Sequence, residues 1–158
     1  APDHYRGGDL LGSTATDNVV VNEGLNHILD ATFSAATQLT SWYIGIFEGD
    51  VTPGATVTAS NVASTLTEIT GDYDEATRQT ATFGSASSQA IDNSNSTADF
   101  TISTDATTVN GAFLTTDSTK GGTTGVLISA GDFASPETAD DGDTLEVTVE
   151  YSLADDGA

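Results

Sequence analysis

The sequence predicts a mainly β fold, an antiparallel β-sandwich or a small barrel, with one N-terminal amphipathic helix and an extended N-terminal arm. Three observations predict it. Several short segments alternate apolar with polar residues and are separated by turn residues, which is typical of antiparallel sheets. Thr accounts for 27 of the 158 residues, and this β-branched residue suits the pleated surface of a strand. A single segment has apolar residues at helical spacing.

The chain is expected to consist of an arm, residues 1–17, and one β-rich domain, residues 18–158. The arm is polar and rich in glycine, and its isolated apolar pair is Leu10-Leu11. Two states of the arm are open: it is disordered, or it becomes ordered against a neighbouring subunit.

The helix is predicted over residues 22–34. Asn22 is a plausible N-cap, and Glu23 lies near the positive end of the helix dipole. His27 and Asp30 lie beside the apolar stripe, so His27 is interpreted as a helix-surface or packing residue rather than a catalytic base. The stripe itself consists of Leu25, Ile28, Leu29 and Phe33.

Six strands follow from the pattern of apolar residues. The segment 42–47 is apolar almost throughout, which predicts a strand that is buried on both faces. The clearest alternation is in 144–153, where every second residue is apolar. Residues 120–125 have the glycine content of a hairpin connection. The predicted strands cover 42–47, 78–83, 98–104, 109–115, 126–130 and 144–153.

The charge of the chain is strongly one-sided. Asp and Glu number 24 against 3 Lys and Arg, which gives a formal net charge of −21. Such a surface repels itself, and molar salt would screen that repulsion. Seventeen of the 24 acids are Asp and Lys occurs once, a balance that resembles proteins of extreme halophiles. The alternative is an ordinary acidic protein of marine or bacterial origin.

The same composition bears on partners. Contacts to nucleic-acid phosphates need Lys and Arg, so direct nucleic-acid binding is not expected, nor is binding to an anionic membrane. No apolar stretch is long enough to span a bilayer. There is no Cys, which excludes disulfides and a Cys nucleophile.

The sequence has no pattern that points to catalysis. The two histidines, His4 and His27, are not part of a nucleophile elbow, an H-E-x-x-H pair or a phosphate-binding loop. We therefore expect a protein that is not an enzyme and has no cofactor. A hydrolase that uses a carboxylate pair is the remaining enzymatic alternative. Asn95-Ser96-Thr97 is a glycosylation triplet, which is weak evidence because such triplets are frequent.

Two clusters of carboxylates are candidate cation sites, since Ca²⁺, Na⁺ or K⁺ take oxygen ligands from such loops. The alternative is that both are solvated acidic loops. Arg78 follows the first cluster and is expected to pair within that loop or with a neighbour's acidic surface. The candidate ligands are Asp72, Asp74 and Glu75 in the first cluster and Asp140, Asp141 and Asp143 in the second.

Several short motifs, in this order, resemble a family of small structural proteins of tailed viruses. The resemblance extends over most of residues 19–153, and none of the motifs is a catalytic signature. Members of that family are described as head decoration (cement), tail or fibre-associated proteins. The strong acidity agrees with a virus of a haloarchaeon. The motifs are Val20–Leu25, Trp42–Gly49, Tyr73–Arg78, Gly111–Leu114 and Lys120–Gly125.

The resemblance implies a non-enzymatic capsid decoration protein on the outer surface of the virion. It would bind the major capsid protein, stabilise the shell and form a homo-oligomer, with a trimer favoured. The alternative is a tail- or fibre-associated module that contacts the host surface. Because basic residues are few, contacts with acidic neighbours should be apolar, Thr-rich or bridged by cations. The expected interface residues are Tyr5, Arg6, Leu10 and Leu11, with Trp42 and Tyr43 in the core or at a subunit interface.

Overall fold

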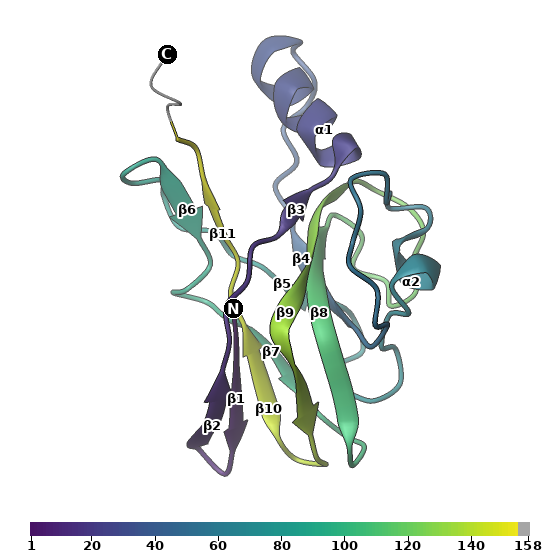
Figure 1. Cartoon of the computed structure of the whole chain (residues 1–158). Coiled ribbons are helices and arrows are strands. Elements are labelled where there is room, and N and C mark those ends of the chain that lie inside the picture. Colours follow the sequence, from purple (N-terminus) through teal and green to yellow (C-terminus); the bar gives the residue numbers. More distant parts are fainter. Residues whose placement is uncertain (155–158) are drawn as a thin grey trace.

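The computed structural model describes residues 1–154 and is mainly β, with antiparallel strand pairs throughout (Figure 1). Its strands form a five-stranded, a four-stranded and a two-stranded sheet. The elements are β1 (Pro2–Arg6), β2 (Asp9–Ser13), β3 (Val19–Val20), α1 (Asn22–Phe33), β4 (Tyr43–Phe47), α2 (Val62–Thr65), β5 (Gln79–Thr80), β6 (Ala90–Asp92), β7 (Ala98–Thr101), β8 (Thr107–Thr115), β9 (Leu127–Ala139), β10 (Thr144–Val147) and β11 (Glu150–Ser152).

The five-stranded sheet has the order β3-β9-β8-β4-β5. Its two long strands, β8 and β9, are joined by the glycine-containing connection that the sequence predicts, and they pair antiparallel. β4 lies beside β8, and its last four residues are buried, as an apolar run predicts. β9 is much longer than predicted, since it continues from Leu127 to Ala139.

The four-stranded sheet has the order β2-β1-β10-β7. The alternating segment 144–153 is not one strand. It divides into β10, in this sheet, and β11, which pairs with β6 in the two-stranded sheet. Leu145 and Val147 are buried as the alternation predicts, whereas Leu153 is exposed.

The main hydrophobic cluster draws side chains from both larger sheets. It contains Ile44 and Ile46 of β4 together with Phe100 of β7 and Leu145 of β10. A second cluster packs the α2 segment, including Val62, against the other side of the five-stranded sheet. The five-stranded sheet is therefore covered on both faces, which explains why β4 has no polar positions.

Residues 1–17 differ from the extended arm that the sequence predicts. β1 and β2 form an antiparallel hairpin, and β1 adds to the edge of β10. The turn is Gly7-Gly8, and both residues have positive φ (59° and 92°), which glycine adopts without steric cost. The segment therefore belongs to the domain's own sheet, and Leu10-Leu11 lie on its outermost strand.

Other differences concern short elements. The alternating segment 78–83 forms strand only at β5, and β6 and α2 were not predicted. α1 lies in the predicted part of the sequence, but its N-cap is Val21 rather than Asn22, and no side-chain hydrogen bond caps it. Among the residues that the structure describes, no helix is long and apolar enough to cross a membrane.

Candidate interaction surface

The apolar stripe of α1 points away from the body of the protein. The four stripe residues are 44–80% exposed, and Phe33 is the most exposed. The other side of the helix faces the protein and is small or polar: Gly24 is buried, and His27 and Ala31 are half-buried. An amphipathic helix normally turns its apolar face to the core. In α1 this order is reversed. We call Leu25, Ile28, Leu29 and Phe33 the α1 stripe.

Three contacts hold α1 in this orientation. The Glu23 carboxylate accepts backbone hydrogen bonds from Ala59 (2.7 Å) and Leu127 (3.1 Å). Gly24 lies against the backbone of Ile128, so close that a Cβ atom would come within 2.4 Å of the Ile128 carbonyl oxygen. Farther along, the His27 ring meets the Trp42 ring edge-on, with centroids 6.3 Å apart. The helix is thus fixed by its small and polar side.

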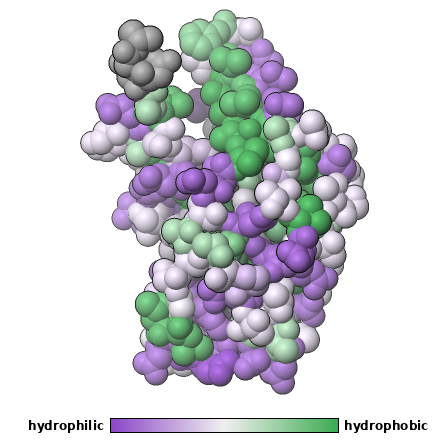
Figure 2. Space-filling model, viewed as in Figure 1, coloured by the Kyte–Doolittle hydropathy of each residue, from purple (hydrophilic) through white to green (hydrophobic). Residues whose placement is uncertain are grey.

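A second exposed apolar surface lies on the N-terminal hairpin. Leu10 and Leu11 on β2 are 55% and 52% exposed. In Figure 1, β2 lies at the lower end of the molecule and α1 at the upper end, and Figure 2 shows hydrophobic surface at both ends. We call Leu10 and Leu11 the hairpin pair. Within residues 1–154, the α1 stripe and the hairpin pair are thus two exposed apolar surfaces that lie far apart (Figure 1), and Val51 and Leu153 are further exposed apolar residues.

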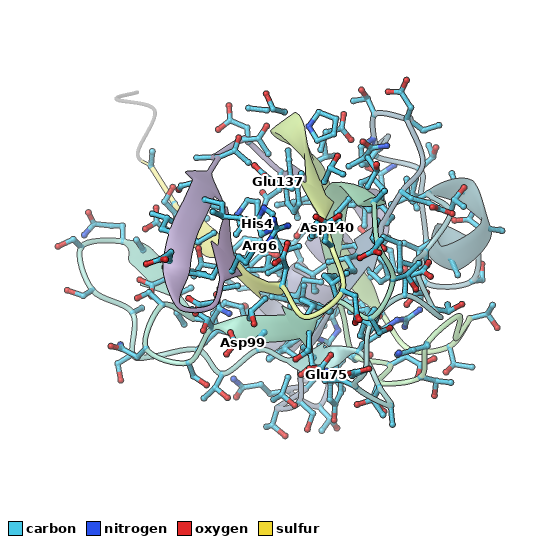
Figure 3. The ribbon with its side chains drawn as sticks, turned by 90° about the horizontal axis from the view of Figure 1, so that it is seen from below. His4, Arg6, Glu75, Asp99, Glu137 and Asp140 are labelled. Carbon is cyan, nitrogen blue, oxygen red and sulfur yellow. The ribbon has the colours of Figure 1, made fainter. Side chains whose placement is uncertain are left out.

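The hairpin is fastened to the domain through Asp143. The buried Asp143 carboxylate accepts hydrogen bonds from Arg6 Nε (2.7 Å) and from the Asp140 backbone N–H (2.9 Å), and it contacts His4 Nε2 at 2.9 Å. His4 is itself buried, with Nδ1 3.7 Å from the Glu137 carboxylate. Figure 3 shows the His4 and Arg6 side chains beside Asp140. The arrangement ties β1 to the β9–β10 loop.

These contacts shift the pKa values of the groups. The hydrogen bond from Arg6 is the main cause that lowers the pKa of Asp143 well below its usual range, and the contacts with Asp140 N–H and His4 act in the same direction. The pKa of Arg6 is raised, chiefly by its hydrogen bond to Asp143. Both shifts favour the charged pair, so the hairpin is held by an ion pair at neutral pH.

A row of three carboxylates crosses the four-stranded sheet. Asp3 on β1, Glu146 on β10 and Asp99 on β7 are direct cross-strand neighbours. Burial raises the pKa of Glu146, and the charges of Asp99 and Asp3 raise it further. Like charges directly opposite one another destabilise a sheet. The sequence did not predict this row, because it depends on strand register.

The six predicted cation ligands do not form one group that could hold a metal ion, within residues 1–154. Glu75 accepts the Thr101 backbone N–H with both carboxylate oxygens, at 3.1 Å each, and Figure 3 shows it well apart from Asp140. Asp74 and Asp141 are exposed, and Asp72 is half-buried. Asp140 is bonded to Arg6 (2.7 Å), and Asp143 is occupied as described above. Within residues 1–154, no three His, Asp or Glu side chains are grouped to hold a metal ion.

The predicted interface residues have mixed surroundings. Arg6 is exposed but bound to Asp140 and Asp143, and Tyr5 is half-buried. Trp42 is half-buried and packs against the main cluster, and Tyr43 is half-buried on β4. Asn95 of the glycosylation triplet is exposed in the turn between β6 and β7. Leu10 and Leu11 are the members of this set with an open apolar surface.

Arg78 has a different partner from the expected one. It does not pair with its sequence neighbours Asp74 and Glu75. Its guanidinium is buried and forms two hydrogen bonds with the Glu68 carboxylate, at 2.8 and 2.7 Å. Sequence reasoning missed this pair because Glu68 has no distinguishing neighbours, and burial is the property that makes the pair important.

Two cavities formed by the described residues are small. One, of about 70 Å³, lies between the two larger sheets next to Ile44 and Val147. The other, of about 120 Å³, lies beside Asn110 and Asp132. Both are below the roughly 300–1,000 Å³ of typical small-molecule sites. The exposed apolar surfaces are therefore the better candidates for function.

No known protein family matches the chain, and no curated protein matches its sequence significantly. The resemblance to virion proteins thus stays a prediction that rests on the order of the motifs.

Proposed function

We propose that the chain is a non-enzymatic structural protein of a tailed virus that binds the outside of the major capsid shell and stabilises it. One observation carries the proposal: a small β domain presents two exposed apolar surfaces at opposite ends (Figures 1 and 2). A protein that cements a shell has to contact two neighbours at once, and two separated surfaces permit this. The order of the sequence motifs supports the same role.

The hairpin pair is the proposed contact with the capsid protein. Leu10 and Leu11 lie on β2, which is the outermost strand of its sheet and has a free edge. An exposed strand edge can pair with a strand of another protein, while side chains in pockets give specificity. The Arg6–Asp143 pair would hold the hairpin in position for this contact.

The proposed architecture is a β-sandwich. The two larger sheets share one hydrophobic cluster, which is the arrangement expected when two sheets pack face to face. The acidic exterior suits a particle in concentrated salt, as proposed for a haloarchaeal virus.

The proposal is tested by adding the purified protein to capsid shells that lack it, in molar salt. We expect wild-type protein to cosediment with the shells, and a variant with Leu10→Asp and Leu11→Asp to stay in solution. Val51→Asp is the matched control, because Val51 is a similarly exposed apolar residue (47%) away from the hairpin. Binding to tails or host envelopes instead of shells would favour the tail or fibre alternative.

A further inference from the structure

We propose that the α1 stripe is a self-association surface, on which a second copy of the chain packs its own α1 antiparallel, about a two-fold axis at Leu29. The proposal does not rest on the virion role, since it concerns contact between copies of this chain.

The first argument is that α1 needs a cover. It has 12 residues, and isolated helices of this length are marginal in water. Helices in proteins gain most of their stability by packing an apolar face. In α1 the packed side offers Gly24, His27 and Ala31, whereas the stripe is open to solvent. A partner on the stripe would supply the missing packing.

The second argument concerns charge. α1 has no Lys or Arg, and its acids are Glu23 and Asp30. Glu23 is engaged with backbone N–H groups of Ala59 and Leu127, so Asp30 is the one exposed acid of the helix. On a chain of net charge −21, this is a face where an equally acidic copy can approach without opposing rows of carboxylates. A basic partner would find little charge here to recognise.

The third argument is the spacing of the stripe. Leu29 lies four residues from Leu25 and four from Phe33, so the stripe is centred on it. In an antiparallel pair centred there, Leu29 meets Leu29 of the second copy, and Leu25 meets Phe33. The same patch then serves on both copies, as a two-fold interface requires. The contact is about 12 Å long, from the rise of about 1.5 Å per residue.

The antiparallel pair is favoured over a three-fold bundle of parallel helices. Parallel helices align their dipoles and set like ends side by side, whereas antiparallel helices set opposite ends together. A parallel bundle would also place every Asp30 at the same height. In the antiparallel pair, the two Asp30 carboxylates lie on opposite sides of the axis.

The size of the stripe predicts a weak pair that salt strengthens. The four apolar side chains of the stripe are only 44–80% exposed, so they offer less area than a standard interface. A standard interface takes roughly 800 Å² per partner, so the pair should be weak. Two copies of charge −21 repel each other, and molar salt both screens this repulsion and strengthens apolar burial. A partner held by opposite charge would respond to salt in the opposite way.

The geometry is tested by single cysteines, because the chain has no Cys of its own. The full chain with Leu29→Cys, treated with a mild oxidant in molar salt, should form a covalent dimer. Leu25→Cys and Phe33→Cys should each remain largely monomeric alone, and should cross-link with each other when mixed. Equal self-cross-linking at all three positions would indicate parallel helices and overturn the proposal.

Sedimentation velocity of the full chain gives the second readout. We expect a monomer–dimer equilibrium that strengthens between about 0.1 and 3 M salt, and a dissociation constant at least about tenfold higher for Leu29→Asp. Val51→Asp should associate like the wild type, and circular dichroism should show all variants equally folded. A monomer at every salt and protein concentration, a trimer, or unchanged association of Leu29→Asp would overturn the proposal.

Discussion

Arg78 lies on Glu68 in a bidentate ion pair in which both side chains are 1% exposed. The guanidinium also donates to the backbone carbonyls of Asp117 (3.0 Å) and Gly122 (3.1 Å) and lies 5.0 Å from the centre of the Phe113 ring. Arg78, one of the three Lys and Arg residues of the chain, is thus buried in the protein interior. It joins the segment before β5 to the β8–β9 connection.

Removing this cation should be costly. We expect Arg78→Met, which retains much of the volume, to lower the free energy of unfolding by about 3–5 kcal/mol, since it leaves the Glu68 carboxylate buried without a partner. Urea unfolding in molar salt measures this change in the free energy of unfolding. The double variant Arg78→Met with Glu68→Met should lose less than the sum of the single changes. A loss below about 1 kcal/mol for Arg78→Met would contradict the structure.

Gly24 should not tolerate a larger residue. Alanine has the better helix propensity by about 1 kcal/mol. Its Cβ, however, would lie 2.4 Å from the Ile128 carbonyl oxygen, which belongs to a paired strand. We expect Gly24→Ala to destabilise the protein by about 1–3 kcal/mol. Gly54→Ala, where a Cβ meets nothing within 4 Å, is the control and should be neutral. Thermal unfolding compares the two.

The Asp143 pair should make the hairpin sensitive to acid. Because the pKa of Asp143 is lowered in the folded state, its contribution to stability is present above the ordinary carboxyl pKa of about 3.9 and is lost as the pH falls toward the folded pKa. The difference in unfolding free energy between wild type and Asp143→Asn should therefore be largest near neutral pH and shrink below about pH 4. The control is Asp141→Asn, at an exposed neighbouring position, and its unfolding free energy should differ little from that of the wild type. A difference that grows on acidification would contradict the assignment.

The carboxylate row on the four-stranded sheet should affect stability in the opposite direction to Asp143 as the pH rises. The pKa of Glu146 is raised, so its ionisation costs stability as the pH rises through its folded range. We expect Glu146→Gln to stabilise the protein at neutral pH by up to about 1 kcal/mol in dilute buffer, and by much less in molar salt. Glu48→Gln, at an exposed glutamate outside the strands, serves as the comparison. Equal effects in dilute and concentrated salt would exclude repulsion as the cause.

The whole chain should depend on salt for its stability. With 24 acids against 3 bases, self-repulsion is strong in dilute buffer, and it is screened within roughly 3 Å at 1 M salt. The circular dichroism signal of the folded protein should decrease when salt falls from molar to tens of millimolar. Full stability in dilute buffer would count against a halophilic surface.

Local patterns predicted the elements that are locally determined. The apolar run at β4, the helical spacing of α1 and the alternation at β10 each identify an element in the correct place. Apolar spacing could not show which side of α1 faces the protein, because this depends on the close contact of Gly24 with Ile128. Likewise, the glycine-rich N-terminus has the composition of an extended arm, and the local sequence does not show that β1 pairs with β10.

Ion pairs between residues that are far apart along the chain could not be predicted either, because they too depend on the tertiary fold. The acids 140–143 resembled a cation site, yet Asp143 is turned inward to Arg6 and His4, which lie far away along the chain. No pattern in the sequence marked Glu68 as the partner of Arg78. The resemblance to virion proteins supplied the proposed role, and the structure supplied the two surfaces that could perform it.

The most direct test of the proposed role is a residue-resolution map of the virus particle that contains this protein. We expect the domain on the outer face of the head, in a copy number comparable with the major capsid protein, with the hairpin pair against the shell. A location on the tail, a few copies per particle, or an exposed hairpin with no contact to the shell would contradict the account.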